Sequence, residues 1–157
     1  MCLLLGLPVG GVHVESLPSP LGRSPSVDFH SPARLALQRG EHCSRDEVDR
    51  LSVVLMAGIA AEALSCGAAD GGAADQRAVA ELLATHCPHV PADEQARWAA
   101  ANAVLLLRAH PEAYTALCHQ LSRRASVGEC CSAVEAAVAA SRHGRPRLVL
   151  GRDKVEM

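Results

Sequence analysis

The chain has 157 residues, enough for one domain with its own core, and its formal net charge of -2 excludes the strongly basic surface of a nucleic-acid-binding protein. Hydrophobic residues make up 49% of the sequence and aromatic residues only 2%, so the apolar content is mainly Ala, Val and Leu. The seven cysteines are an odd number without regular spacing, which favours reduced thiols over a disulfide framework. No run of about 18 apolar residues predicts a transmembrane segment.

The first part of the chain is expected to be mostly irregular. Residues 3–5 read as the last turn of a helix, with Gly6 as its C-cap. Four prolines predict a loop over residues 13–43, with a short strand near residues 12–14 and a brief helix at residues 33–38.

The clearest helix is predicted at residues 44–66. Ser44 and Glu47 have the spacing of a capping box, which marks the start of a helix. Large apolar residues then recur at steps of three and four, which places them on one helix face: Val48, Leu51, Leu55 and Ile59. The second half is rich in alanine and forms a slim face that another helix can approach closely. Gly67 is the expected C-cap.

Further helices are expected at about 75–86, at about 91–108, from Pro111 onward and after Ser126. The helix at 91–108 is almost wholly apolar from Trp98 to Leu107, which predicts a central helix buried on all sides. The sequence therefore predicts an all-α fold, a bundle of about five helices with an irregular N-terminal segment and a disordered basic tail.

Several catalytic motifs are absent from the sequence. There is no GxxxxGK[ST] loop to bind nucleotide phosphates and no GxSxG nucleophile motif. There is also no H-E-x-x-H, the helical motif that supplies two histidine ligands to zinc. No residue is therefore assigned a catalytic role.

Two groups of residues remain as candidates for chemistry. Asp75 lies where a glycine-rich loop becomes a helix, so helix capping explains it as well as a role as a metal ligand would. His86, Cys87 and His89 are potential metal donors, but their spacing matches no zinc motif, and a solvated helix end is the simpler interpretation.

Several short motifs resemble the peptidase domain of FtsH-type zinc metalloproteases. The stretch at residues 56–64 (MAGIAAEAL) is followed at residues 71–75 by GGAAD, much as a family helix is followed by a loop that ends in aspartate. The match is closer to a plant and algal chloroplast offshoot that lacks the ATPase module. That offshoot has segments similar to GLP at residues 6–8, VDRL at 48–51 and ASVGEC at 125–130.

The resemblance implies a peptidase-like helical domain at residues 1–141 and a basic tail at residues 142–157. It implies a homologue of an ATP-dependent zinc metalloendopeptidase, active in proteolysis and protein quality control and located in the chloroplast. Asp75 occupies the position of the third zinc ligand, whereas the family's two histidines and catalytic glutamate come from a helix just before the Gly-Leu-Pro segment. Where the family has Asn-Asp-Leu, this chain has Ala-Asp-Gln, at residues 74–76.

The sequence as given therefore provides one zinc ligand and is expected to be inactive by itself. One explanation is a fragment of a longer peptidase whose preceding segment carries the zinc helix. The alternative is a non-catalytic helical scaffold that binds a protein partner, such as an organellar protease, through the slim face of the 44–66 helix. A metal-sensing role for His86, Cys87 and His89 is a third hypothesis.

Overall fold

The computed structural model describes residues 1–7, 9–13, 26–29, 39 and 41–141. The described residues fall into two compact units: one contains residues 39 and 41–108, and the other contains residues 2–7, 9–13, 26–29 and 109–141. The expected all-α fold is confirmed: six α-helices lie in the described part, accompanied by one short 3-10 helix and a small two-stranded sheet. The helix expected at 33–38 and the basic tail at 142–157 fall outside the described residues.

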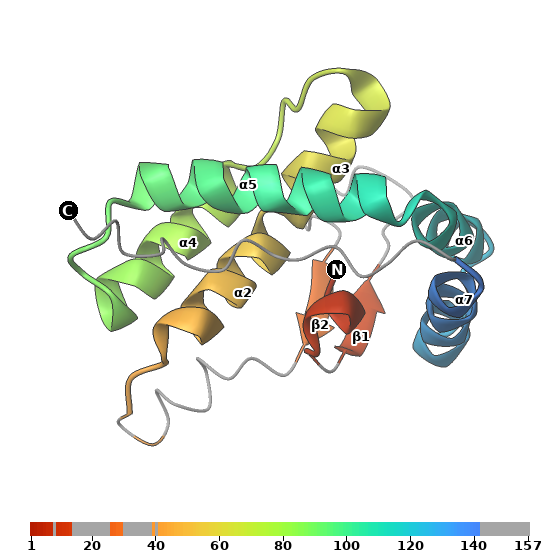
Figure 1. Cartoon of the computed structure of the whole chain (residues 1–157), viewed down its shortest axis with the longest axis horizontal. Coiled ribbons are helices and arrows are strands. Elements are labelled where there is room, and N and C mark those ends of the chain that lie inside the picture. The colour runs from red at the N-terminus through yellow and green to blue at the C-terminus, as the bar shows by residue number, and fades with distance from the viewer. Residues whose placement is uncertain (8, 14–25, 30–38, 40, 142–157) are drawn as a thin grey trace, which may run out of the picture. The chain divides into compact units, whose positions relative to one another are not determined.

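The unit that contains residues 41–108 is built from four helices (Figure 1). They are α2 (Arg45–Leu55), α3 (Ala57–Cys66), α4 (Ala73–His86) and α5 (Ala92–Ala109). Helix α2 packs against α4 and contacts α3. The core side chains of this unit come mainly from α2, α4 and α5: Val48, Leu51, Val53, Val79, Leu83, Ala99, Ala103 and Leu106.

The single helix expected at 44–66 is two helices that meet at Met56. The first of the two helices begins as predicted, with a complete capping box. The Ser44 side chain accepts a hydrogen bond from the Glu47 backbone N–H, and the Glu47 side chain accepts one from the Ser44 backbone N–H. The Ser52 hydroxyl donates to the Val48 carbonyl oxygen at 2.8 Å, a bond of the kind that bends helices. The apolar periodicity continues through the break, so the sequence pattern gave no sign of it.

Helix α5 is buried on one face only, so the expectation that it is buried on all sides is wrong. The five buried residues fall on one side of the helix: Gln95, Ala99, Asn102, Ala103 and Leu106. Leu105 lies outside this set and is 58% exposed. An apolar sequence alone does not surround a helix, because the number of neighbouring elements decides how many faces are covered.

The second unit combines the first residues of the chain with its last two described helices. They are the 3-10 helix η1 (Leu3–Leu5), strands β1 (Val9–His13) and β2 (Ser26–Phe29), and helices α6 (Pro111–Ser122) and α7 (Val127–Ala140). The strands pair antiparallel, α6 packs along α7, and α7 contacts β1. Gly6 ends η1 with a φ of 72°, as expected of a C-cap. Ser126 and Glu129 form the second predicted capping box.

Candidate functional site

Asp75 lies in the first turn of α4, but it does not begin the helix. Helix α4 starts two residues earlier, at Ala73, and Gly72 precedes it with a φ of 100°. Asp75 is half-buried, and burial raises the pKa of its carboxyl above the ordinary aspartate value. A carboxylate favoured mainly by the helix dipole would show the opposite shift. Partial removal from water therefore dominates at this position.

Asp75 lies close to Gly58, the glycine within α3. A Cβ built on Gly58 would lie 3.8 Å from Asp75 Oδ2, so the two helices approach closely there. Gly72 is covered by the side chain of Ile59, and a Cβ at Gly72 would collide with that side chain. The small residues of the 56–64 stretch thus let the start of α4 lie against α3.

Glu62 holds the loop between α3 and α4. Its Oε1 accepts a hydrogen bond from the Asp70 backbone N–H at 3.4 Å, and a Cβ on Gly71 would lie 3.4 Å from its Oε2. The segment that carries the family resemblance is therefore one local unit, in which α3 positions the glycine-rich loop and the start of α4.

The donors around Asp75 do not fit the zinc ion that the resemblance implies. Within the part of the chain that the structure describes, no group of three or more His, Cys, Asp or Glu side chains is arranged to hold a metal ion. Three protein donors are the usual minimum for a catalytic zinc. The role of Asp75 as a ligand stays a prediction, and no chemical step is derived through zinc.

The three potential metal donors near the end of α4 differ in their burial. His89 is exposed, as a solvated helix end predicts, but His86 and Cys87 are buried, so that interpretation is wrong for these two. His86 Nδ1 accepts a hydrogen bond from the Cys43 backbone N–H at 3.2 Å, which joins the end of α4 to the residue before the α2 cap. His86 Nε2 is buried without a hydrogen-bond partner. The arrangement is a structural junction.

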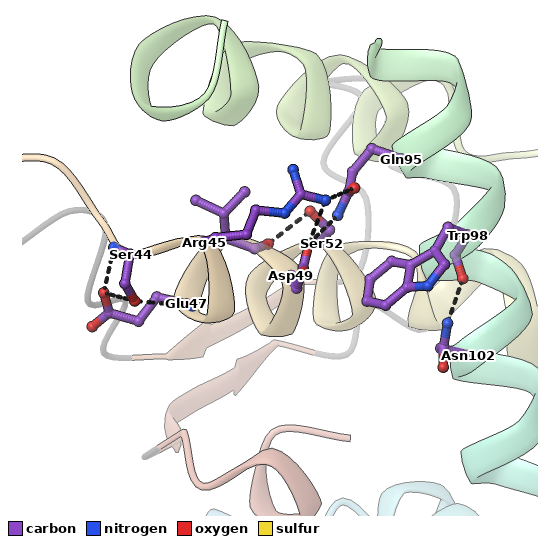
Figure 2. A network of polar contacts seen from close by, with 9 residues as sticks. Ser44, Arg45, Glu47, Asp49, Ser52, Gln95, Trp98 and Asn102 are labelled. Atoms are coloured by element: carbon purple, nitrogen blue, oxygen red, sulfur yellow. Dashed lines mark hydrogen bonds and ion pairs between the residues drawn. The ribbon is translucent and has the colours of Figure 1, made fainter. Parts of the chain in front are cut away.

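A polar network between α2 and α5 was not anticipated from the sequence (Figure 2). Asp49 is 2% exposed, and its Oδ1 lies 2.8 Å from Arg45 Nη2 and accepts a hydrogen bond from Gln95 Nε2 at 2.8 Å. Arg45 Nη2 also donates to Gln95 Oε1 at 2.6 Å. A carboxylate this deeply buried requires such partners. The i,i+4 spacing of Arg45 and Asp49 was the only available signal, and it is common on solvated helices.

Beside this network lies a hollow of about 460 Å³, formed by the start of α2, the turn before α5 and the first turns of α5. Its lining residues include Arg45, Asp49, Val90, Glu94, Gln95 and Trp98. The described residues thus contain two candidate sites: the α3–loop–α4 unit with Asp75, and the hollow beside Arg45.

Comparison with known proteins adds no family assignment. No family model, no curated protein and no solved structure matches this chain. Among the described residues, no helix is both long and apolar enough to cross a lipid bilayer.

Proposed function

We propose that this chain is an FtsH-type peptidase-like domain that serves protein quality control by binding a protein partner through α3, without cleaving peptide bonds itself. The motifs at residues 56–64 and 71–75 support the kinship, because they form one connected structural unit here. The chloroplast location is part of the same proposal.

The observation that carries the proposal is the exposure of α3. Its sequence, AGIAAEALSC, has one charged residue, yet Ala60 is its only buried residue. Ala57, Ala61 and Ser65 recur at four-residue steps and are half-buried or exposed, so they form a slim face along the helix. Small residues in such a row let a second helix approach closely, and covering them would bury apolar surface that α3 leaves in water.

The partner that fits this face best is an apolar helix of a protease assembly. Ala57 and Ala61 are half-buried and Ser65 is exposed, so the slim face is only partly covered within this unit. A partner helix with its own small or aliphatic residues would pack against the row of alanines. The charged groups of α3 and its loop, Glu62 and Asp70, lie toward the loop and would rim such a contact.

The test is capture of a purified chloroplast FtsH-type protease assembly by the immobilised full chain. Ala61→Arg places a long charged side chain on the slim face and keeps helix propensity high. We expect it to reduce capture by about tenfold or more, as for a central interface residue. Ala101→Arg is the matched control, because Ala101 is an exposed alanine of α5 in the same unit, and it should capture the assembly as the wild type does.

Asp75→Ala separates the binding role from a catalytic one. We expect this variant to retain capture, and we expect the wild-type chain to show no zinc-dependent peptide cleavage. Equal loss of capture in Ala61→Arg and Ala101→Arg would contradict the proposed surface. A zinc-dependent cleavage activity that disappears with Asp75→Ala would reject the scaffold function altogether.

A further inference from the structure

Cys43 and Cys87 are two buried cysteines at the junction where the start of α2 meets the end of α4. They are 7% and 5% exposed, and both are free thiols in this structure. The Cys43 backbone N–H donates to His86 Nδ1 at 3.2 Å, and Cys87 is the residue that follows His86. The two cysteines therefore meet although α2, α3 and α4 all lie between them in the sequence.

The thiols of this pair are near enough to influence one another. Burial raises the pKa of the Cys43 thiol above its ordinary value, and the negative charges of Glu47 and Cys87 raise it further. Cys87 has this effect because it lies close to Cys43, since the interaction of two charges falls off with distance. The raised pKa keeps Cys43 protonated at neutral pH, so the pair stays as two thiols until an oxidant reacts with it.

Neither cysteine lies inside a helix. Cys43 immediately precedes Ser44, the N-cap of α2, and Cys87 is the C-cap of α4. A disulfide fixes the separation and direction of its two Cβ atoms, so a pair of thiols needs small backbone shifts to form one. At these two positions such shifts leave the hydrogen bonds within α2 and α4 in place.

We propose that Cys43 and Cys87 form a reversible thiol–disulfide site that joins the start of α2 covalently to the end of α4. The oxidant is a small-molecule disulfide, such as glutathione disulfide. Oxidation switches the junction from one held by the His86 hydrogen bond to one held by a covalent bond. This site is independent of partner binding through α3, so either assignment stands if the other fails.

The reaction proceeds by two exchanges. One cysteine, as its thiolate, attacks glutathione disulfide, whose S–S bond breaks, so that one glutathione leaves and a mixed disulfide remains on the protein. The other cysteine, as its thiolate, attacks the protein sulfur of the mixed disulfide and releases the second glutathione. The two cysteines together lose two electrons and two protons, and glutathione disulfide takes them up as two glutathione thiols.

The bond encloses α2, α3 and α4 in one covalent loop. Closing a long loop restricts the unfolded chain more than the folded one, so the oxidised form of this unit should be the more stable. The third cysteine of the unit, Cys66, ends α3 and is exposed, which makes it a reference for an accessible thiol outside the pair.

Treatment of the full chain with excess glutathione disulfide, followed by blocking of the remaining thiols, tests the proposal. Cleavage after arginine releases Cys43 in residues 40–45 and Cys87 in residues 78–97, and neither peptide contains another cysteine. Mass spectrometry should find these two peptides joined as the main linked product, and dithiothreitol should separate them. Cys66 should carry glutathione, which shows that the oxidant was active.

Thermal unfolding measures the effect of the bond on stability. Oxidation should raise the unfolding temperature of the wild type by about 5 °C or more. Cys43→Ala removes the pair and should lose both this rise and the linked peptides. Cys66→Ala is the matched control, because it removes a cysteine of the same unit outside the pair, and it should respond to oxidation as the wild type does.

Three results would overturn the proposal. The first is that Cys43 and Cys87 stay as thiols after Cys66 has reacted, which would make them small apolar side chains of the core and nothing more. The second is glutathione or a different cysteine bound to either of them in place of the bond between them. The third is a linked product whose unfolding temperature is no higher than that of the reduced chain.

Discussion

Helices α2 and α3 come from one continuous apolar pattern, yet they differ in how they are buried. Helix α2 carries five charged residues in its eleven and buries five side chains, including Val48, Leu51 and Val53. Helix α3 carries one charged residue in its ten and buries only Ala60. Large side chains concentrated on one face give α2 a contact with α4, whereas small residues spread around α3 give it little area to bury. The size and position of apolar residues therefore matter more than their number.

The largest expected effect compares a leucine in each helix. Leu51 of α2 is 2% exposed, whereas Leu64 of α3 is half-buried. Leu51→Ala should lower the free energy of unfolding by about 2–5 kcal/mol, because it removes buried methyl groups and leaves a cavity. Leu64→Ala should cost less than about 1 kcal/mol. Urea denaturation followed by circular dichroism measures both, and equal losses would mean that α3 is as well packed as α2.

A smaller effect is expected at the glycine that joins α3 to α4. Gly72 has a φ of 100° and lies under the Ile59 side chain, so Gly72→Ala suffers both backbone strain and a steric clash. The expected loss is about 2 kcal/mol. Gly67→Ala is the control, because Gly67 has a φ of 81° but open space around it, and should cost about 1 kcal/mol.

Thermal or urea denaturation of both variants separates the strain from the clash. Adding Ile59→Ala should reduce the cost of Gly72→Ala and leave the cost of Gly67→Ala unchanged. If Ile59→Ala fails to reduce the cost at Gly72, the close approach of α3 to the loop is not what makes glycine necessary there.

The smallest effect concerns Asp75, the group that α3 partly shields from water. Burial raises the pKa of its carboxyl, so the folded state favours the protonated form. The stability this group contributes is present below the ordinary pKa of aspartate and is lost as the pH rises through the raised pKa. Asp75→Asn should therefore be slightly more stable than the wild type at pH 7, by less than about 1 kcal/mol.

The difference between Asp75→Asn and the wild type should vanish as the pH falls towards about 3, below the ordinary aspartate pKa. Unfolding curves at a series of pH values measure it. A wild type that is more stable than Asp75→Asn at pH 7 would show that the carboxylate has a favourable partner, such as a cation. If added zinc stabilises the wild type but not Asp75→Asn, the same conclusion follows.

Sequence reasoning located the helices better than the sites. Both capping boxes are where the spacing of serine and glutamate predicts them, and Gly67 ends α3 as expected. The start of α4 was placed two residues late, because an aspartate in the first turn resembles a cap. The prediction of a solvated helix end was wrong for His86 and Cys87, which are both buried; His86 Nδ1 accepts a hydrogen bond from the backbone N–H of Cys43, 43 positions away in the sequence. The metal role of Asp75 stays a prediction.

The sequence by itself determined the all-α class and the ends of the capped helices, because a capping box needs only residues three positions apart. The tertiary structure decided which apolar helix is buried and which polar groups meet. Asp49 and Gln95 are 46 positions apart, and only the packing of α5 near α2 brings their side chains to 2.8 Å. Burial depends on the surfaces that neighbouring elements provide, and a residue pattern within one helix carries no information about those surfaces.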